Sequence, residues 1–271
     1  MDLFAFQVNT PETFSINDIA VKSTTISKLS KEIYCLLSGN PKQIITLNTD
    51  FLRISYIDKD FKSICTNNCI IVPDGIGVIL LLFFRYGKAI EKITGCDLFD
   101  ICLNIADKNK LKIALVGSTS TTHIKIRSII KDKFPGIILK TISPSYEFEK
   151  SPIENNMVIN ELKLFLPDIL FVALGCPRQE KWIHTYKDLI GAKINIGVGA
   201  VFDFYAGTKK RAPKFVRTIW LEWFWRLLHE PRRLFKRYII LGLPFFIKTS
   251  LQQFFSAGNE QHKIASFNKN V

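Results

Sequence analysis

The apolar residues of this chain fall into two kinds of run. Short continuous apolar runs, typical of buried strands, alternate with longer segments in which apolar residues recur every three or four positions, as in helices. Strands are predicted at residues 43–48, 70–72, 112–117, 137–142, 168–174 and 193–198. Helices are predicted at residues 26–37, 49–58, 76–84, 98–107, 119–133, 153–165 and from residue 178 onward. This alternation predicts an α/β fold with a mostly parallel sheet and helices on both faces.

The pattern changes after Gly207, where aromatic and basic residues replace the alternation of strands and helices. Trp220, Trp223 and Trp225 lie in one predicted helix over residues 219–228, which Pro231 interrupts. We therefore predict a Rossmann-like α/β domain over residues 1–206, a helical, basic and aromatic appendage over residues 207–256, and a polar, disordered tail over residues 257–271. Residues 1–15 are weakly patterned.

Positive charge is concentrated in the appendage. The formal net charge is +13, and between Tyr205 and Phe255 eleven Lys and Arg residues face only two acidic ones, Glu222 and Glu230. Such a segment attracts phosphates, whether in nucleic acid, anionic lipid or a phosphorylated substrate. Aromatic rings among these basic residues favour a segment that lies in the interface of an anionic membrane. The alternative is a basic helix whose aromatic residues belong to the protein core.

Other features restrict the class of protein. Residues 1–14 contain acidic but no basic residues, so no signal peptide is predicted, and the six cysteines are expected to be reduced thiols in the cytoplasm. Neither these cysteines nor the four scattered histidines have the spacing of a metal site. No apolar run reaches the roughly 20 residues that span a bilayer.

Polar residues follow several predicted strands, at the edge of an α/β sheet where ligands bind. Asp74 lies at the turn between a strand and an apolar helix, and is a candidate general base. The alternative is that Asp74 caps that helix. Thr46 and Asn48 follow the preceding strand, and they could either contact a ligand or satisfy the loop backbone.

Two further loops complete this predicted crevice. The backbone N–H groups around Gly117 could hold an anion, and Gln179 and Glu180 begin a helix after another strand. Hydroxyl, amide and carboxylate groups on successive loops suit a polyhydroxylated substrate. The chain has no G-x-G-x-x-G fingerprint, which argues against the rival hypothesis of a dinucleotide-dependent oxidoreductase.

A series of short motifs points to a known family. In chain order they are Pro73-Asp74-Gly75, Thr94-Gly95-x-Asp97-Leu98, Gly175-x-Pro177-x-Gln179-Glu180, Gly197-Val198-Gly199-x-x-Phe202-Asp203, Gly207, Arg211-Ala212-Pro213 and Leu221-Glu222-Trp223-x-x-Arg226-Leu227-x-x-Glu230-Pro231-x-Arg233. Over residues 16–246 the chain resembles the WecG/TagA/CpsF family of bacterial glycosyltransferases (glycosyltransferase family 26).

The resemblance implies a reaction and its partners. It implies inverting transfer of N-acetylmannosamine, or its uronic acid, from a UDP-sugar to undecaprenyl-diphosphate-linked N-acetylglucosamine, for a cell-surface polysaccharide or teichoic-acid-type glycan. The enzyme would be peripheral on the cytoplasmic face of the membrane, with no metal or other cofactor and no nucleic-acid partner, and homo-oligomerisation is left open. The alternatives are a different UDP-hexose or UDP-uronic acid donor, or a non-enzymatic basic membrane adaptor.

The resemblance also assigns residues. It makes Asp74 the catalytic base, places Thr46, Asn48 and Gln179 in the pocket, and lets Arg226 and Arg233 close over it. Lys92 stands where the family usually has an arginine, Lys236 stands where another arginine is frequent, and Arg237 follows it. The predicted substrate-binding residues are therefore Thr46, Asn48, Lys92, Gly117, Gln179, Glu180, Arg226, Arg233 and Arg237.

Overall fold

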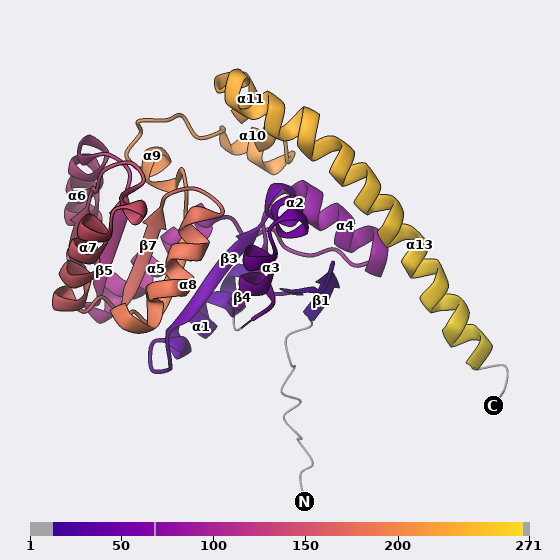
Figure 1. Cartoon of the computed structure of the whole chain (residues 1–271), viewed down its shortest axis with the longest axis horizontal. Coiled ribbons are helices and arrows are strands. Elements are labelled where there is room, and N and C mark those ends of the chain that lie inside the picture. The colour runs from indigo at the N-terminus through magenta and orange to yellow at the C-terminus, as the bar shows by residue number, and fades with distance from the viewer. Residues whose placement is uncertain (1–12, 68, 268–271) are drawn as a thin grey trace, which may run out of the picture.

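A six-stranded sheet forms the centre of the protein. The computed structural model describes residues 13–67 and 69–267. The sheet has the order β4-β3-β8-β7-β5-β6, and each neighbouring pair is parallel (Figure 1). Its strands are β3 (Lys42–Leu47), β4 (Cys69–Pro73), β5 (Lys112–Gly117), β6 (Ile138–Ile142), β7 (Ile169–Ala173) and β8 (Ile194–Gly197). The α/β sheet predicted from the sequence is confirmed.

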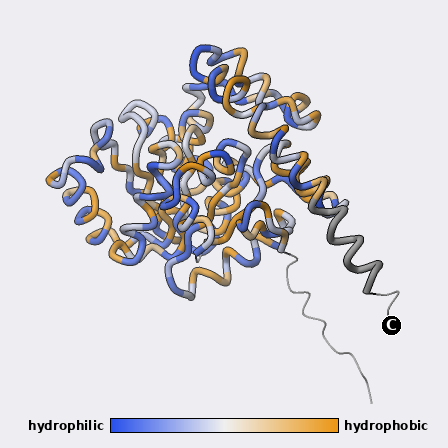
Figure 2. The backbone as a smooth tube through the Cα atoms, turned by 45° about the vertical axis from the view of Figure 1, so that its right-hand side comes forward, coloured by the Kyte–Doolittle hydropathy of each residue, from blue (hydrophilic) through white to orange (hydrophobic). Residues whose placement is uncertain are grey.

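Helices cover both faces of this sheet because alternate strand residues point to opposite sides. In β5, Ile113 and Leu115 pack into one core cluster, whereas Ala114 and Val116 pack into another. One layer contains α1 (Ile26–Leu36), α5 (Gly95–Asn109), α6 (Ser120–Lys133) and α9 (Val201–Tyr205). The other contains α2 (Thr49–Ile57), α3 (Lys59–Thr66), η1 (Phe148–Lys150), α7 (Pro152–Phe165) and α8 (Arg178–Ile190). Figure 2 shows hydrophobic segments gathered in the interior of this domain.

A small hairpin lies beside the α2–α3 layer. It consists of β1 (Thr13–Ile16) and β2 (Ile19–Lys22), paired antiparallel, and it packs near the end of α4 (Ile76–Tyr86). The Tyr86 hydroxyl accepts the N–H of Ser15 and donates to its carbonyl, both at 3.0 Å. The sequence pattern predicted neither this hairpin nor α3. Residues 1–12 lie outside the described part of the chain.

The appendage is helical, as predicted, and crosses from α9 to α4 (Figure 1). Its elements are α10 (Lys214–Thr218), α11 (Glu222–His229), α12 (Pro231–Phe235), η2 (Lys236–Gly242) and α13 (Leu243–Phe267). Helix α13 packs along α4. A side chain at Gly77 would lie 3.6 Å from the Phe246 ring, and Arg85 donates to Gln253 at 3.1 Å. Helix α13 extends through residues 257–267 of the predicted tail, residues 268–271 are not described, and the predicted domain boundaries and disorder of the tail stay predictions.

Candidate active site

The predicted site residues line the carboxyl edge of the sheet. Asp74 follows β4, Asn48 follows the neighbouring β3, and Gly117 ends β5, four strands away from β4. With about 4.8 Å between neighbouring strands, this row extends over about 19 Å. It can therefore accommodate an extended ligand, with Asp74 and Gly117 at opposite ends.

Asp74 has a backbone anchored in the sheet and a carboxyl group that caps no helix. Its N–H donates to the carbonyl of Leu47 at 2.8 Å, which fixes the turn after β4. The N-cap residue of α4 is Gly75, with a φ of 81° and no side-chain capping bond. The alternative that Asp74 caps this helix is therefore wrong.

The surroundings of Asp74 favour a weakly acidic carboxyl group. The pKa of Asp74 is raised to about 7, mainly by burial and also by the negative charges of Glu222 and Asp97, against the opposing effect of Lys92 and Arg226. A carboxylate whose pKa lies near neutral pH is suited to accept a proton in catalysis. Glu222 and Arg226 belong to α11, so the appendage contributes charges to the surroundings of the predicted base.

Lys92 connects the α/β domain to the appendage. The N–H of Ile93 donates to the Pro73 carbonyl at 2.9 Å, which holds the Lys92 segment beside the end of β4. The Lys92 ammonium lies 3.9 Å from the Glu222 carboxylate, and both side chains are about four-fifths buried. Glu222 was not predicted as a site residue. The sequence indicated it as one of two acids in a basic segment and as a member of the motif that begins at Leu221.

Asn48 and Thr46 lie one strand away from Asp74. The Asn48 side-chain oxygen accepts the N–H groups of Asp50 and Phe51 at 3.0 and 3.1 Å, so it caps α2. Thr46 is buried within β3, opposite Val72 of β4. The alternative that Asn48 satisfies the local backbone is thus correct for its oxygen, and its contact with a ligand stays a prediction.

Gln179 joins two loops of the site. Its side-chain oxygen accepts the N–H of Gly175, after β7, at 3.0 Å and that of Gly199, after β8, at 3.1 Å. Its amide nitrogen donates to Glu180 at 2.7 Å, and the side chain is 3% exposed. These bonds give Gln179 the role of fixing both loops, beyond any contact it makes with a ligand.

Glu180 and Arg237 form a second charged group at this edge of the sheet. Burial raises the pKa of Glu180 to about 7, while Arg237 and the bond from Gln179 oppose the shift. The second carboxyl oxygen of Glu180 is buried without a hydrogen-bond partner among the described residues. Arg237 lies 2.7 Å from Asp50 and thereby ties η2 to the start of α2.

The loop after β5 is connected to the appendage by a chain of charges. Ser118 donates to Asp203 at 3.3 Å, and the Lys209 ammonium lies 3.6 Å from Asp203 and 3.3 Å from Glu230. We call this set the Asp203–Lys209–Glu230 bridge. None of its members was predicted as a site residue, although Asp203 and Glu230 occur in the motifs quoted above.

The predicted cations lie along the same edge but have different partners. Arg233 pairs with Glu230 at the turn between α11 and α12, and Arg226 lies 5.7 Å from the ring centre of Phe204. Gly117 itself has a φ of 96°, a conformation that favours glycine. Within residues 13–67 and 69–267, no three His, Cys, Asp or Glu side chains are grouped as metal ligands.

Comparisons with known proteins identify the family to which this chain is similar. The model of the glycosyl transferase WecG/TagA/CpsF family matches residues 14–259. A Bacillus subtilis (strain 168) protein named N-acetylglucosaminyldiphosphoundecaprenol N-acetyl-beta-D-mannosaminyltransferase is 33% identical over 210 residues, which cover 78% of this chain and 79% of that protein. A Staphylococcus aureus (strain MRSA252) protein of the same name is 29% identical over 217 residues, covering 80% of this chain and 82% of the relative.

Proposed function

The chain belongs to the WecG/TagA/CpsF family of glycosyltransferases, and we propose that it transfers an N-acetylmannosamine-type sugar from a UDP-sugar to undecaprenyl-diphosphate-linked N-acetylglucosamine. The names of the two relatives support this sugar and this acceptor. The observation that carries the proposal is the position of Asp74. It is a shielded carboxyl group at the sheet edge, influenced by Lys92 of the α/β domain and Arg226 of the appendage.

In the proposed reaction, Asp74 acts as the general base. The acceptor hydroxyl gives its proton to the Asp74 carboxylate while its oxygen forms a bond to the anomeric carbon of the donor sugar. The bond between that carbon and the diphosphate oxygen breaks, and UDP leaves with the electron pair. Attack from the face opposite the leaving group inverts the configuration at the anomeric carbon.

Cationic side chains would stabilise the departing diphosphate. Charge develops on the leaving oxygen in the transition state, and fixed positive groups in a shielded site stabilise it strongly. Lys92 and Arg226, whose charges act on Asp74, are the candidates for this role, and Arg233 pairs with Glu230 of the Asp203–Lys209–Glu230 bridge. The row of loops suits a nucleotide-sugar whose sugar lies near Asp74 and whose nucleotide extends toward β5. No metal is required in this proposal.

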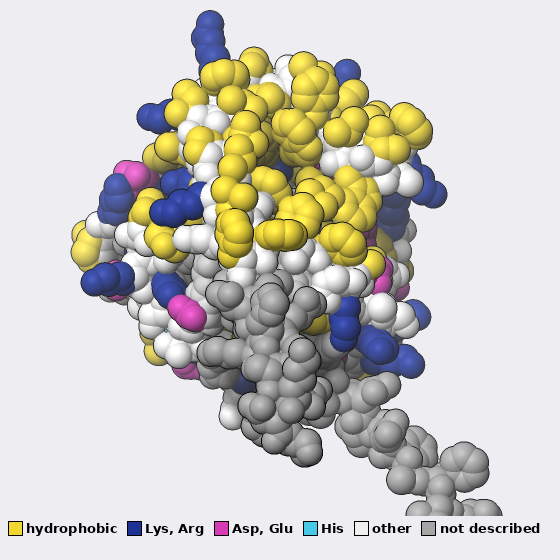
Figure 3. Space-filling view, turned by 90° about the vertical axis from the view of Figure 1, so that its right-hand side faces the viewer, with side chains coloured by type: hydrophobic (Ala, Val, Ile, Leu, Met, Phe, Trp, Pro, Cys, Tyr) yellow, Lys and Arg dark blue, Asp and Glu magenta, His cyan; other side chains and the backbone are white. Residues whose placement is uncertain are grey.

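The acceptor's lipid remains in the bilayer, so the enzyme must reach the membrane surface. None of the described helices has the length and hydropathy needed to span a bilayer. Large apolar side chains are exposed along the appendage, among them Phe215, Trp220, Trp223, Phe224, Leu228 and Phe235. Figure 3 shows apolar side chains gathered on one face with Lys and Arg around it. We propose that this face docks on the cytoplasmic side of an anionic membrane, where each basic residue contributes about 1 kcal/mol.

A donor screen tests the reaction. Purified protein is incubated with a short-chain lipid-diphosphate N-acetylglucosamine acceptor and a panel of UDP-sugars, and product masses are measured. Product from UDP-N-acetylmannosamine alone supports the proposal, with Asp74→Asn as the inactive control. Product from another UDP-sugar only would retain the mechanism and replace the proposed donor. Absence of product with every donor, in the presence of membranes, would contradict the proposed reaction.

A further inference from the structure

Gln179 and Glu180 lie in the middle of the row of loops that forms the candidate site. In the sheet order, β8 and β7 lie between β3, which is followed by Asn48, and β5, which ends at Gly117. Both residues belong to the first turn of α8, and Gln179 is bonded to the loops after β7 and β8. Gln179 is 3% exposed and Glu180 is 1% exposed, so neither side chain offers a surface to a ligand. Both were predicted as substrate-binding residues, and their burial indicates a different role.

Hydrogen bonds at both ends fix the orientation of the Gln179 amide. Its oxygen accepts two N–H groups, those of Gly175 and Gly199, and so uses both of its lone pairs. Its nitrogen donates to Oε1 of Glu180 at 2.7 Å, which is its acceptor among the described residues. If the amide were flipped, its N–H groups would face the two loop N–H groups, and its oxygen would face the carboxyl group. Glu180 therefore selects the orientation in which Gln179 holds both loops.

The Gln179–Glu180 pair also packs directly against the end of β8. A Cβ atom at Gly197 would lie 2.6 Å from the Gln179 side-chain nitrogen and 2.6 Å from Oε1 of Glu180. Both distances are shorter than the roughly 3.5–4.0 Å of an ordinary carbon contact. Packing against the backbone of Gly197 and hydrogen bonding thus hold the two side chains in one arrangement.

The main chain of Glu180 is tied to a third strand. The side-chain nitrogen of Gln43 donates to the Glu180 carbonyl at 3.1 Å. Gln43 belongs to β3 and is completely buried. Glu180 is therefore connected to β3 through its main chain, and to the loops after β7 and β8 through Gln179. The position of one carboxyl group is linked in this way to three neighbouring strands of the sheet.

We propose that Glu180 is a positioning residue that contacts no substrate and holds Gln179 in the orientation that fixes the loops after β7 and β8. This inference rests on the proposed function in one respect, namely that a nucleotide-sugar lies along the row of loops. With its sugar near Asp74 and its nucleotide extending toward β5, the diphosphate of that donor would cross the two fixed loops. Glu180 would then set the affinity for the donor without touching it.

Hydrogen exchange of the free full chain measures how firmly the loops are held, without any sugar substrate. Exchange at the N–H groups of Gly175 and Gly199 is followed by mass spectrometry with fragmentation that resolves single amides. Glu180→Met removes the acceptor at almost unchanged volume, so exchange at both amides should become at least about tenfold faster, because Gln179 loses its fixed orientation. Glu180→Gln keeps an oxygen acceptor and should keep both exchange rates within about threefold.

Gly197→Ala tests the same arrangement from the side of β8. The added methyl group would displace the Gln179–Glu180 pair, although both of these residues are unchanged. Exchange at Gly175 and Gly199 should therefore again become about tenfold faster. This variant also decides the question if Glu180→Met does not fold.

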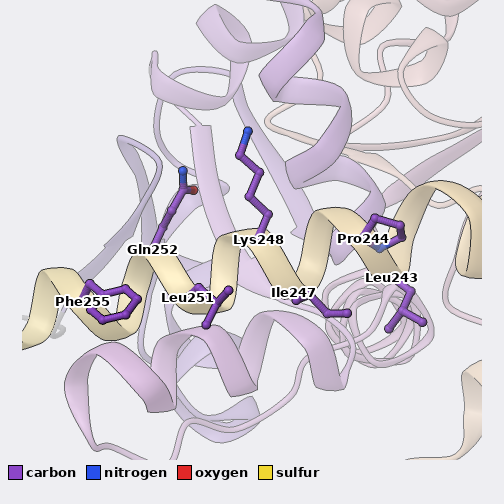
Figure 4. A pocket seen from close by; sticks show the side chains of 7 residues that line it. All are labelled: Leu243, Pro244, Ile247, Lys248, Leu251, Gln252 and Phe255. Atoms are coloured by element: carbon purple, nitrogen blue, oxygen red, sulfur yellow. The ribbon is translucent and has the colours of Figure 1, made fainter.

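Two controls separate this effect from a general loss of stability. Asn155 is 5% exposed and is bonded to Trp182 and Tyr186 of the same helix α8 at 2.8 and 3.0 Å. Asn155→Met breaks these buried bonds and should lower the free energy of unfolding, but it should leave exchange at the two loop amides within about twofold. Gln252→Met makes a similar change on α13, where Gln252 rises from the same side as Lys248 (Figure 4), and should also leave both exchange rates unchanged.

Donor kinetics connect the loops to the reaction. Fixed loops hold the donor equally in the ground state and in the transition state, so Glu180→Met should raise the donor KM about tenfold and change kcat by less than about threefold. Glu180→Gln should leave both constants near their wild-type values. A direct contact between the Glu180 carboxyl group and a substrate predicts instead that Glu180→Gln and Glu180→Met are equally impaired.

Each contrary outcome overturns the inference. Unchanged exchange in Glu180→Met or in Gly197→Ala would show that the pair does not fix the loops. Equally fast exchange in Asn155→Met would assign the effect to a general loosening of α8, and an equal kinetic loss in Glu180→Gln would assign to Glu180 a direct contact with substrate. Because hydrogen exchange needs no substrate, it decides the role of Glu180 in the loops even if the donor screen contradicts the proposed reaction.

Discussion

Replacing Asp74 by asparagine should stabilise the protein at neutral pH while removing most of its transferase activity. In the folded protein, burial and then Glu222 raise the pKa of Asp74 to about 7 from its ordinary value of 3.8. The folded state therefore binds a proton that the unfolded state releases at pH values between about 4 and 7. Over this window the free energy of unfolding decreases as pH rises, and above it the loss is complete.

The magnitude follows from the size of the pKa difference. About three pKa units correspond to an upper bound of about 4 kcal/mol of lost stability at pH 8, which a neutral asparagine would restore. At pH 5 most of the folded wild-type protein is already protonated at Asp74, so the gain should fall to about 1–2 kcal/mol. The same substitution removes the proton acceptor and should lower the rate about 10²- to 10⁴-fold.

Urea unfolding of both proteins at pH 5 and pH 8 measures this difference, and transfer to the short-chain acceptor gives the activity. Asp97→Asn is a suitable control, because the Asp97 carboxylate accepts the N–H and hydroxyl of Thr94 at 2.8 and 2.7 Å in a capping box. That change should destabilise the protein by about 1 kcal/mol at pH 5 and by less at pH 8, because it removes the cap and also one of the negative charges that raise the pKa of Asp74. An Asp74→Asn protein that is no more stable at pH 8, or equally stabilised at both pH values, would refute the reasoning.

Three further substitutions test other parts of the structure. Gly77→Ala should lower stability by about 1 kcal/mol in thermal unfolding, because its Cβ would lie 2.1 Å from the Thr49 hydroxyl, and Thr49→Ala in addition should restore it. Lys209→Met should slow transfer about fivefold or more, because it removes the cation of the Asp203–Lys209–Glu230 bridge. Lys209→Arg keeps this charge and should keep the rate. Trp223→Ser should weaken co-sedimentation with anionic vesicles, whereas Leu164→Ser, an exposed residue of α7, should not.

The sheet could be predicted from the sequence because its strands are buried on both faces. A continuous apolar run such as residues 169–172, bounded by turn residues and followed by a helical pattern, is typical of a central strand in a parallel sheet. The hairpin at Thr13–Ile16 and Ile19–Lys22 was missed because each strand is short and the turn has no glycine. Helix α3 was missed because it has only eight residues and begins directly after α2, with Asp58 both ending α2 and capping α3, so no separate turn announces a second helix.

The sequence could predict which residues of each loop belong to the candidate site, but not the contacts between segments that are distant in the chain. Asp74 follows β4 directly and Gln179 lies in the first turn of the helix after β7, and strand ends meet at one edge of a parallel sheet. What Asn48 does could not be decided from sequence, because an asparagine after a strand can cap a helix or contact a ligand equally well. Glu222 and Lys209 were missed because their partners are distant in the chain, and only the docked appendage brings them together.

The appendage is attached to the α/β domain at both of its ends. It leaves the domain after α9 and returns to it where α13 packs on α4. A segment fixed in this way behaves as a closed loop rather than a free tail, and its side chains remain at a high effective concentration near the site, of the millimolar order for short flexible connections. In the proposed reaction, Arg226 and Glu222 would therefore be able to move away from Asp74, to admit substrate or release product, and to return over a short distance. The charges around Asp74 would then be brought together again by a local closing motion in each turnover.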